Sequence, residues 1–153
     1  MDVFQILKED HKKVSGIFAK LEETTENATK TRGELFTKLK TELDIHAHVE
    51  ETQFYPVIKR EAETREITLE GFEEHHVIKT LLKELEAGDV GSEQWTAKLK
   101  VLKENVEHHV EEEEGEMFVK AREVLSAEQI ENITANVEAE KKAQQQKVSA
   151  AGQ

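Results

Sequence analysis

Apolar side chains recur at intervals of three and four residues along four long segments of this 153-residue chain. That period places the apolar side chains on one face of an α-helix. The segments cover residues 2–23, 36–57, 72–85 and 92–124, and they contain few helix-breaking residues. Long helices joined by short loops favour antiparallel neighbours. The sequence therefore predicts an all-α fold: an antiparallel up-down-up-down four-helix bundle.

A shorter helix is expected after the bundle. Ser126 and Gln129 have the spacing of a capping box, and the helix should continue to about Lys142. The remaining stretch, AQQQKVSAAGQ, is weakly patterned and is expected to fray. We therefore expect a bundle over residues 1–125, and a C-terminal helix with a frayed tail over residues 126–153 that packs on the bundle or extends from it. The single proline, Pro56, should kink or end the second bundle helix.

Composition argues against several classes of partner. The net charge of −12 disfavours binding to nucleic acid and to anionic membrane surfaces. The absence of cysteine excludes disulfides and thiolate metal ligands, which fits a reducing compartment. No apolar run approaches transmembrane length, and the start MDVFQILKEDHKK lacks a signal-peptide pattern. We expect a cytoplasmic protein with no membrane partner.

Six ionisable residues occupy positions where the apolar stripes should continue. They are His11 in the first segment, His46 and Glu50 in the second, His75 in the third, and His109 and Glu113 in the fourth. Burying an unpaired charge costs several kcal/mol. Residues of this kind therefore need ionic partners or a metal ion.

The chain also repeats this pattern. The segments 46–50 and 109–113 each have a glutamate four residues after a histidine, which puts both side chains on one helix face. His11 precedes the first of these pairs by 35 residues, and His75 precedes the second by 34. Two helix hairpins with this pattern would meet around a pseudo-two-fold axis, which suits a dinuclear metal site.

The other histidines and acids of these segments have a simpler interpretation. A lone histidine on an apolar face is more often a hydrogen-bonded core residue than a ligand. Helix geometry places His48 on the solvent side, and it places His76 and His108 at the boundary. The same geometry predicts that the acids flanking Glu113 are solvated; they are Glu111, Glu112 and Glu114.

This arrangement resembles the hemerythrin-like, HHE cation-binding family, over roughly residues 5–125. The family pattern is a histidine on helix 1, His-x3-Glu on helix 2, a histidine on helix 3 and His-x3-Glu on helix 4. The resemblance implies two iron ions, with an oxo, hydroxo or water bridge between them. It implies that one iron is held by His11 and His46, the other by His75 and His109, and that Glu50 and Glu113 bridge them.

Two positions depart from the oxygen-carrying hemerythrins. Lys79 stands where those proteins have a further histidine on helix 3, and Glu113 replaces an aspartate on helix 4. His108 also gives a His-x4-Glu spacing, so either His108 or His109 could be the ligand; the stripe spacing favours His109. With one imidazole fewer, reversible oxygen carriage is less favoured. The nitrogen and oxygen ligands suit Fe, Mn, Co or Zn equally.

The expected function is therefore that of a non-haem di-iron protein that binds or senses oxygen or related small oxidants, or handles iron. The alternative is a di-iron oxidase or peroxidase-type enzyme acting on ferrous iron, peroxide or nitric oxide. Without a separate acid–base pair, a binding protein is favoured over a dedicated enzyme. A third hypothesis is a metal-free helical bundle with a structural role. The sequence indicates no particular protein partner.

Overall fold

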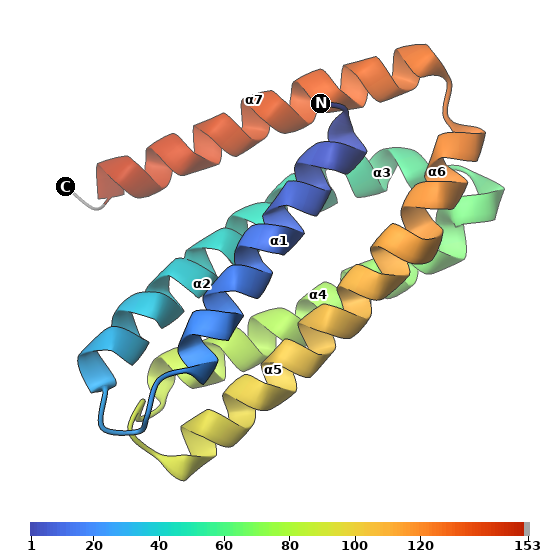
Figure 1. Cartoon of the computed structure of the whole chain (residues 1–153). Coiled ribbons are helices and arrows are strands. Elements are labelled where there is room, and N and C mark those ends of the chain that lie inside the picture. Colours follow the sequence, from blue (N-terminus) through green and yellow to red (C-terminus); the bar gives the residue numbers. More distant parts are fainter. Residues whose placement is uncertain (152–153) are drawn as a thin grey trace.

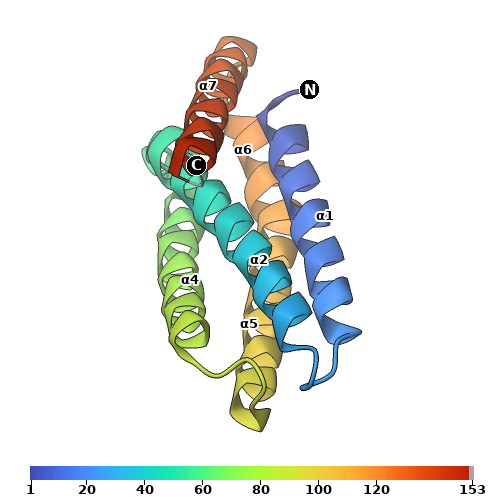
Figure 2. The same cartoon turned by 90° about the vertical axis from the view of Figure 1, so that its left-hand side faces the viewer.

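The computed structural model describes residues 1–151, and its helices form the predicted antiparallel bundle (Figure 1). The four bundle helices are α1 (Val3–Glu22), α2 (Thr29–Val49), α4 (Ala62–Ala87) and α5 (Glu93–Glu112). The α1–α2 and α4–α5 turns lie at the same end of the bundle, and a fifth long helix crosses the other end (Figures 1 and 2). The all-α prediction is confirmed.

Side chains fix where several helices begin. The Asp2 carboxylate accepts from the Gln5 backbone N–H at 3.0 Å, and the Gln5 side chain accepts from the Asp2 N–H at 2.9 Å. Ser92 caps α5 by accepting from the Trp95 N–H at 3.1 Å. The capping box expected from Ser126 forms, with the Gln129 N–H donating to the Ser126 hydroxyl at 3.1 Å. These bonds satisfy backbone donors that the first helical turn leaves free.

Two π-helical turns interrupt the second and fourth bundle segments. The turn η1 (Glu50–Phe54) leads into α3 (Tyr55–Ile58), and η2 (Glu113–Met117) leads into α6 (Phe118–Val124). In each turn a backbone N–H donates to the carbonyl five residues earlier, from Tyr55 to Glu50 and from Phe118 to Glu113. Such turns are frequent at functional sites. Pro56 follows the first of them, and the helix then ends at Ile58.

The apolar core has two parts. One surrounds Phe4, Phe54 and Phe118 at the end where the chain begins, and the other surrounds Leu39 and Leu102 towards the α1–α2 and α4–α5 turns. On α1, α4 and α5 the six ionisable residues that interrupt the apolar stripes lie in sequence between the two parts, and on α2 they alternate with Ile45 and Val49 of the first part. The bundle therefore holds a polar layer between two apolar layers.

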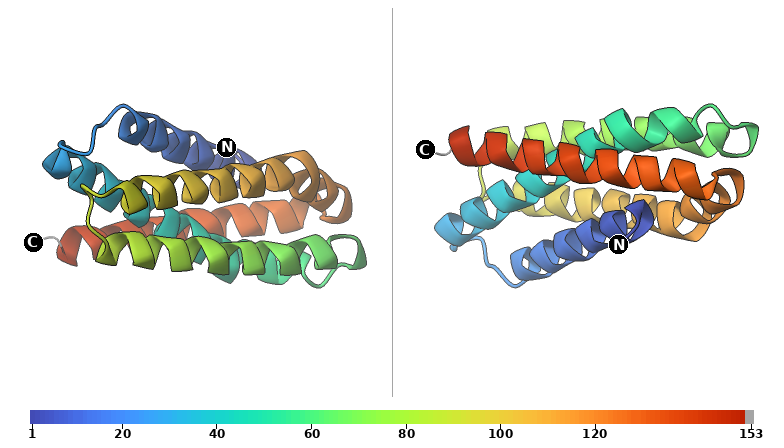
Figure 3. Two further views of the ribbon diagram at one scale, coloured as in Figure 1. Left: turned by 90° about the horizontal axis from the view of Figure 1, so that it is seen from below. Right: turned by 90° about the horizontal axis from the view of Figure 1, so that it is seen from above.

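The fifth long helix, α7 (Ala127–Ala151), contacts α1, α2 and η1 (Figure 3). It buries Ile133 and Val137 against the first part of the core. The prediction that the chain frays after Lys142 is wrong up to Ala151, because alanine, glutamine and lysine are strong helix formers and Gln144 bonds to Glu140 at 2.9 Å. Residues 152–153 of the expected tail lie outside the described residues. None of the described helices has the length and apolar character needed to cross a membrane.

Candidate metal centre

The structure brings the six polar stripe residues together in the middle of the bundle. Each is at most 7% exposed: His11 on α1, His46 and Glu50 at the end of α2, His75 on α4, and His109 and Glu113 at the end of α5. They form two groups of four that could each hold one ion. His11 and His46 belong to one group, His75 and His109 belong to the other, and both glutamates belong to both groups.

The two glutamates lie between the two halves. One oxygen of Glu50 is 3.1 Å from Nε2 of His46 and 3.1 Å from Nε2 of His75. The two oxygens of Glu113 face different halves: Oε1 lies 3.0 Å from His11 Nε2, and Oε2 lies 3.2 Å from His109 Nε2. A carboxylate that faces a histidine of each half is placed to bridge two cations.

Each of the four clustered imidazoles also contacts a carboxylate other than Glu50 and Glu113 through its outer nitrogen, Nδ1. The Nδ1 atoms lie 2.6 Å from Glu114 for His11, 2.9 Å from Asp10 for His46, 2.8 Å from Glu51 for His75, and 2.6 Å from Glu74 for His109. Because a carboxylate accepts, each Nδ1 donates, and the Nε2 of a neutral ring is left with a lone pair that points inward. This is the usual way in which proteins orient metal-binding histidines.

The inward atoms are therefore almost all acceptors. His75 Nε2 and His109 Nε2 face each other at 3.1 Å, which two lone pairs do not tolerate without a proton or a metal ion between them. His46 Nε2 lies 3.1 Å from Glu50 Oε1 but without the geometry of a hydrogen bond, and among the buried side-chain nitrogen and oxygen atoms of residues 1–151 only this atom and Glu50 Oε2 lack a hydrogen-bond partner. Imidazole nitrogens and carboxylate oxygens suit Fe, Mn, Co or Zn, so these residues fit a divalent or trivalent metal.

Without metal, protons take the place of the cations. Burial by itself would lower the pKa of His109, but the negative charge of Glu113 and hydrogen bonds to Glu113 and Glu74 raise this pKa to about 10. The pKa of His46 is also raised, against its burial, by Glu50 and Asp10. A metal ion must displace these protons to reach the nitrogens, so binding should release protons.

Tyr55 also reaches the centre, and the sequence did not suggest it. Its fully buried hydroxyl donates to Glu113 and lies 3.4 Å from Glu50, 3.3 Å from His75 Nε2 and 3.4 Å from His109 Nε2. Burial and then the charges of Glu113 and Glu50 raise the pKa of this phenol well above its usual value. In the metal-free protein Tyr55 is therefore a neutral donor.

The tyrosine breaks the internal repeat of the chain. Its position in the second half of the repeat is Phe118, which also follows a π-turn. The Tyr55 ring stacks on His75 with a centroid distance of 5.2 Å, and Phe118 stacks on His11 at 6.2 Å. Gly71 leaves room for the phenol, since a Cβ there would lie 3.0 Å from the Tyr55 oxygen. Of the two residues that follow the π-turns, only Tyr55 carries an oxygen, and it lies in the half with His75.

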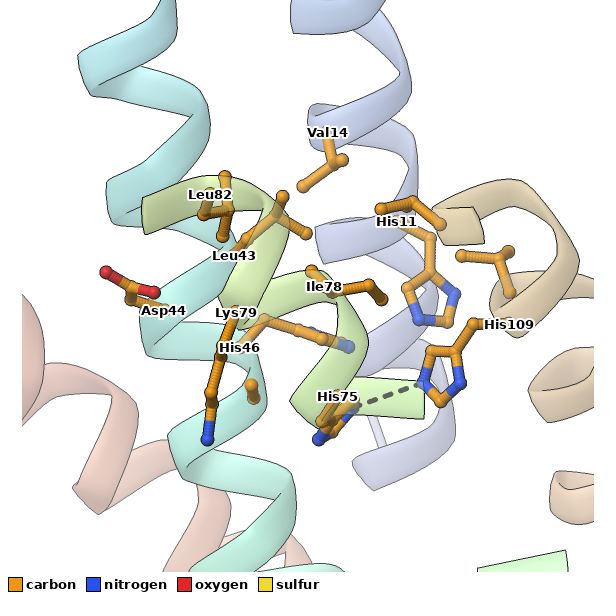
Figure 4. Close-up of a pocket in the computed structure, with 13 residues that line it drawn as sticks. His11, Val14, Leu43, Asp44, His46, His75, Ile78, Lys79, Leu82 and His109 are labelled. Carbon is orange, nitrogen blue, oxygen red and sulfur yellow. Dashed lines mark hydrogen bonds between the residues drawn. The ribbon is translucent and has the colours of Figure 1, made fainter. Parts of the chain in front are cut away.

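A small cavity borders the histidines on the side away from Tyr55. Figure 4 shows the four imidazoles beside an apolar group that includes Val14, Leu43, Ile78 and Leu82. The cavity has room for about one water-sized molecule. Asp44 and Lys79, whose side chains are 43% and 42% exposed, lie at its edge between α2 and α4. A small, weakly polar molecule is the ligand that such a space accommodates.

The remaining histidines do not enter the centre. His76 is exposed, and the side chain of His108 is 67% exposed and pairs with Glu112 at 3.1 Å, so the centre contains His109. His48 is not simply solvated, because it lies 2.8 Å from Glu140 of α7.

The prediction for Glu114 is wrong, since this acid bonds to His11. The periodicity of one helix predicts only which side chains point into the bundle. The outer carboxylates, which are those that bond to the Nδ1 atoms, instead contact an imidazole on a neighbouring helix. Of the acids beside Glu113, Glu111 is exposed as predicted, and Glu112 is half-buried.

Known proteins resemble this chain along most of its length. Residues 2–121 match the family model described as Hemerythrin HHE cation binding domain. A crystal structure of a hemerythrin HHE cation binding domain-containing protein from Mycobacterium kansasii, described as an Rv2633c homolog, has a TM-score of 0.78 and 24% identity. That match covers 100% of this chain and 95% of the other. At this identity it supports the fold alone.

A protein named DNA nickase from Nostoc sp. (strain PCC 7120 / SAG 25.82 / UTEX 2576) is 28% identical over 151 residues. The match covers 97% of this chain but only 41% of that relative, so the chain spans less than half of the longer protein. The family match, in contrast, includes all six residues of the buried cluster. This chain belongs to the hemerythrin HHE cation-binding family.

Proposed function

We propose that this protein holds two iron ions in the buried cluster, and that this centre binds or senses oxygen or a related small oxidant, or handles iron. The ligands would be His11 and His46 for one iron, His75 and His109 for the other, and Glu50 and Glu113 for both, with an oxo, hydroxo or water bridge. The observation that carries the proposal is the convergence of four imidazole Nε2 atoms, each oriented through its Nδ1, on two shared carboxylates.

Iron is favoured over other metals by the family and by the proposed chemistry, since a redox-active ion can respond to an oxidant. The bound ions would supply a site for a small oxidant. The chain itself contributes rigid imidazoles, a phenol proton at Tyr55 Oη, and an apolar cavity that limits access by water and by large molecules. The absence of cysteine is compatible with a reducing cytoplasm as the place of action.

Metal analysis and an optical spectrum of aerobically purified protein test this proposal. We expect about two iron atoms per chain, as two ligand groups imply, and absorption bands typical of an oxo-bridged ferric pair. The bands should change when oxygen is removed and reductant is added. A chain that takes up no metal from ferrous solution, and that shows no such bands, would contradict the di-iron proposal.

Replacing Tyr55 with phenylalanine should leave both metal ions bound and change the visible absorption of the one near His75. The change gives the half with His75 the same aromatic residue that Phe118 provides in the other half. If the phenol oxygen contacts ferric iron, the wild type has a visible phenolate-to-iron absorption band, and Tyr55→Phe lacks it while retaining the same iron content. Phe118→Leu is the matched control and should keep the band. Identical spectra for wild type and Tyr55→Phe would exclude contact between the phenol and the metal.

The second candidate is an oxidase or peroxidase-type enzyme at the same centre. It is favoured by one observation, namely that the Tyr55 hydroxyl is a proton donor directed into a cluster of acceptors. Turnover of ferrous iron or hydrogen peroxide by the wild type, reduced in Tyr55→Phe at unchanged iron content, would support it. Oxygen binding without turnover would favour the binding protein.

DNA cleavage is the activity in the name of the longer Nostoc relative, and we do not extend it to this chain. A net charge of −12 disfavours contact with a phosphate backbone. The proposed ligands are also buried, at most 7% exposed, and out of reach of a duplex.

A further inference from the structure

The helix α7 lies outside the family match, yet it reaches the proposed metal centre. The match ends at residue 121, and α7 begins at Ala127. Three contacts dock it beside α1 and α2: Thr134 accepts from the Val3 backbone N–H at 2.9 Å, Glu140 pairs with His48 at 2.8 Å, and Val137 is fully buried. The helix is therefore held in a fixed position along the half of the centre that contains His11 and His46.

One residue of α7 continues the chain of contacts to a proposed ligand. Lys141 Nζ lies 2.6 Å from Oδ1 of Asp10, and Oδ2 of the same carboxylate lies 2.9 Å from His46 Nδ1. The side chain of Asp10 is 8% exposed, and that of Lys141 is 26% exposed. Both oxygens of Asp10 are thus used, one by a fixed positive charge and one by the imidazole.

The other half of the repeat also pairs an outer carboxylate with a lysine, but this lysine belongs to the bundle: Lys79 Nζ of α4 lies 2.9 Å from Oε2 of Glu51, the oxygen that holds His75 Nδ1 at 2.8 Å. Glu74 corresponds to Asp10, because it precedes His75 as Asp10 precedes His11, and it holds His109 at 2.6 Å. Within residues 1–151, the basic partners of Glu74 are His109 and, at 3.9 Å, His108. Within the same residues Glu74 meets no lysine, so each half has one outer carboxylate paired with a lysine, and only the lysine of Asp10 comes from α7.

We propose that Lys141 is a positioning residue for the metal centre, through which α7 fixes Asp10 and His46. Neutralising Asp10 makes it a weaker acceptor of the Nδ1 proton, so His46 donates less electron density to its metal. The lysine also prevents rotation of the carboxylate away from the ring. This inference rests on the proposed di-iron function and goes beyond it, since it assigns a role to a helix outside the bundle.

The test compares Lys141→Met, Lys141→Arg and Lys142→Met in the full-length, iron-loaded protein. Lys141→Met keeps most of the aliphatic stem and removes the charge, whereas Lys141→Arg keeps the charge. Lys142→Met makes the same charge change at an exposed neighbour and is the matched control. The two readouts are the midpoint potential of the iron centre and the rate of iron release to a chelator.

We expect Lys141→Met to lower the midpoint potential and to release iron about 10-fold faster, the scale typical of groups that orient a metal ligand. Lys141→Arg should stay close to wild type, and Lys142→Met should match wild type in both readouts. A Lys141→Met protein that melts at a lower temperature but keeps the wild-type potential would show a purely structural contact and overturn the inference. If the wild type takes up no iron, the proposed function itself fails; if it takes up iron and all variants behave alike, only the role of Lys141 fails.

Discussion

Replacing Glu113 with glutamine will abolish retention of the metal pair. Both oxygens of this fully buried carboxylate face the cluster, one towards His11 and the other towards His109, so both proposed metal positions lose a ligand together. An amide has one neutral oxygen, and its NH₂ group would point two donors at a cation. We expect metal content to fall from about two ions per chain to well under one, as measured by elemental analysis after gel filtration.

Glu111→Gln is the control for this change, because it removes the same charge two residues away from an exposed side chain. It should retain the full metal content. Retention of both ions by Glu113→Gln would show that this carboxylate is not a shared ligand. Stabilisation of the protein by Glu113→Leu, without any change in metal content, would favour the metal-free structural bundle instead.

Removing the metal should destabilise the protein strongly. A ligand that binds only the folded state stabilises it by about 4 kcal/mol when its free concentration is about 1,000 times its Kd. For a chain of this size that corresponds to a fall in Tm on the order of 10 °C after chelation. Calorimetry with and without chelator measures it. Equal Tm values for the two forms would mean that no metal is linked to folding.

The metal-free protein should also become less stable as the pH rises from neutrality. The pKa of His109 is raised from 6.5 to about 10 in the folded state, so its contribution to stability is complete below pH 6.5 and is lost as the pH rises towards 10. The pKa of Glu113 is lowered well below 4.5, so its contribution is present above pH 4.5 and is lost in acid. Stability of the metal-free form should therefore be highest between about pH 4.5 and 6.5.

In the metal-loaded form the imidazoles are neutral ligands, so the decline above neutral pH should largely disappear. Denaturant titrations of both forms between pH 5 and 9 separate the two cases. A metal-free protein whose free energy of unfolding is constant from pH 6.5 to 9 would show that the buried histidines do not gain protons from their carboxylate neighbours.

The six proposed ligands could be found in the sequence because each interrupts a regular apolar stripe. A buried polar residue in a helical seam is conspicuous when the period around it is clear, and the two halves of the repeat reinforce each other. The outer carboxylates were missed, because which helix lies beside a given imidazole is not contained in one helix's periodicity. The repeat did hold a signal for them: Asp10 and Glu74 each precede a histidine, and Glu51 and Glu114 each follow a proposed bridging glutamate.

The contact of Tyr55 with the cluster could not be predicted from the sequence because of the π-helical turn that precedes it. At about 100° per residue, a side chain five positions after Glu50 would point roughly 140° away from it in an α-helix. In a π-helical turn the fifth residue returns to nearly the same side, since the hydrogen bond spans five residues. Neither Glu50–Phe54 nor Glu113–Met117 has a sequence signal that specifies such a turn. The periodicity therefore predicts the proposed ligands and the buried Phe54 and Met117 that follow four residues after each glutamate, but it does not predict that Tyr55 faces the cluster.

The most direct test of the di-iron proposal is an anomalous difference map at the iron absorption edge, from crystals of the iron-loaded protein. We expect two peaks inside the bundle, one among His11, His46, Glu50 and Glu113, and the other among Glu50, His75, His109 and Glu113. A map with no peak between these residues, or with its only peak at the surface group Glu74, His108 and Glu112, would contradict the central claim.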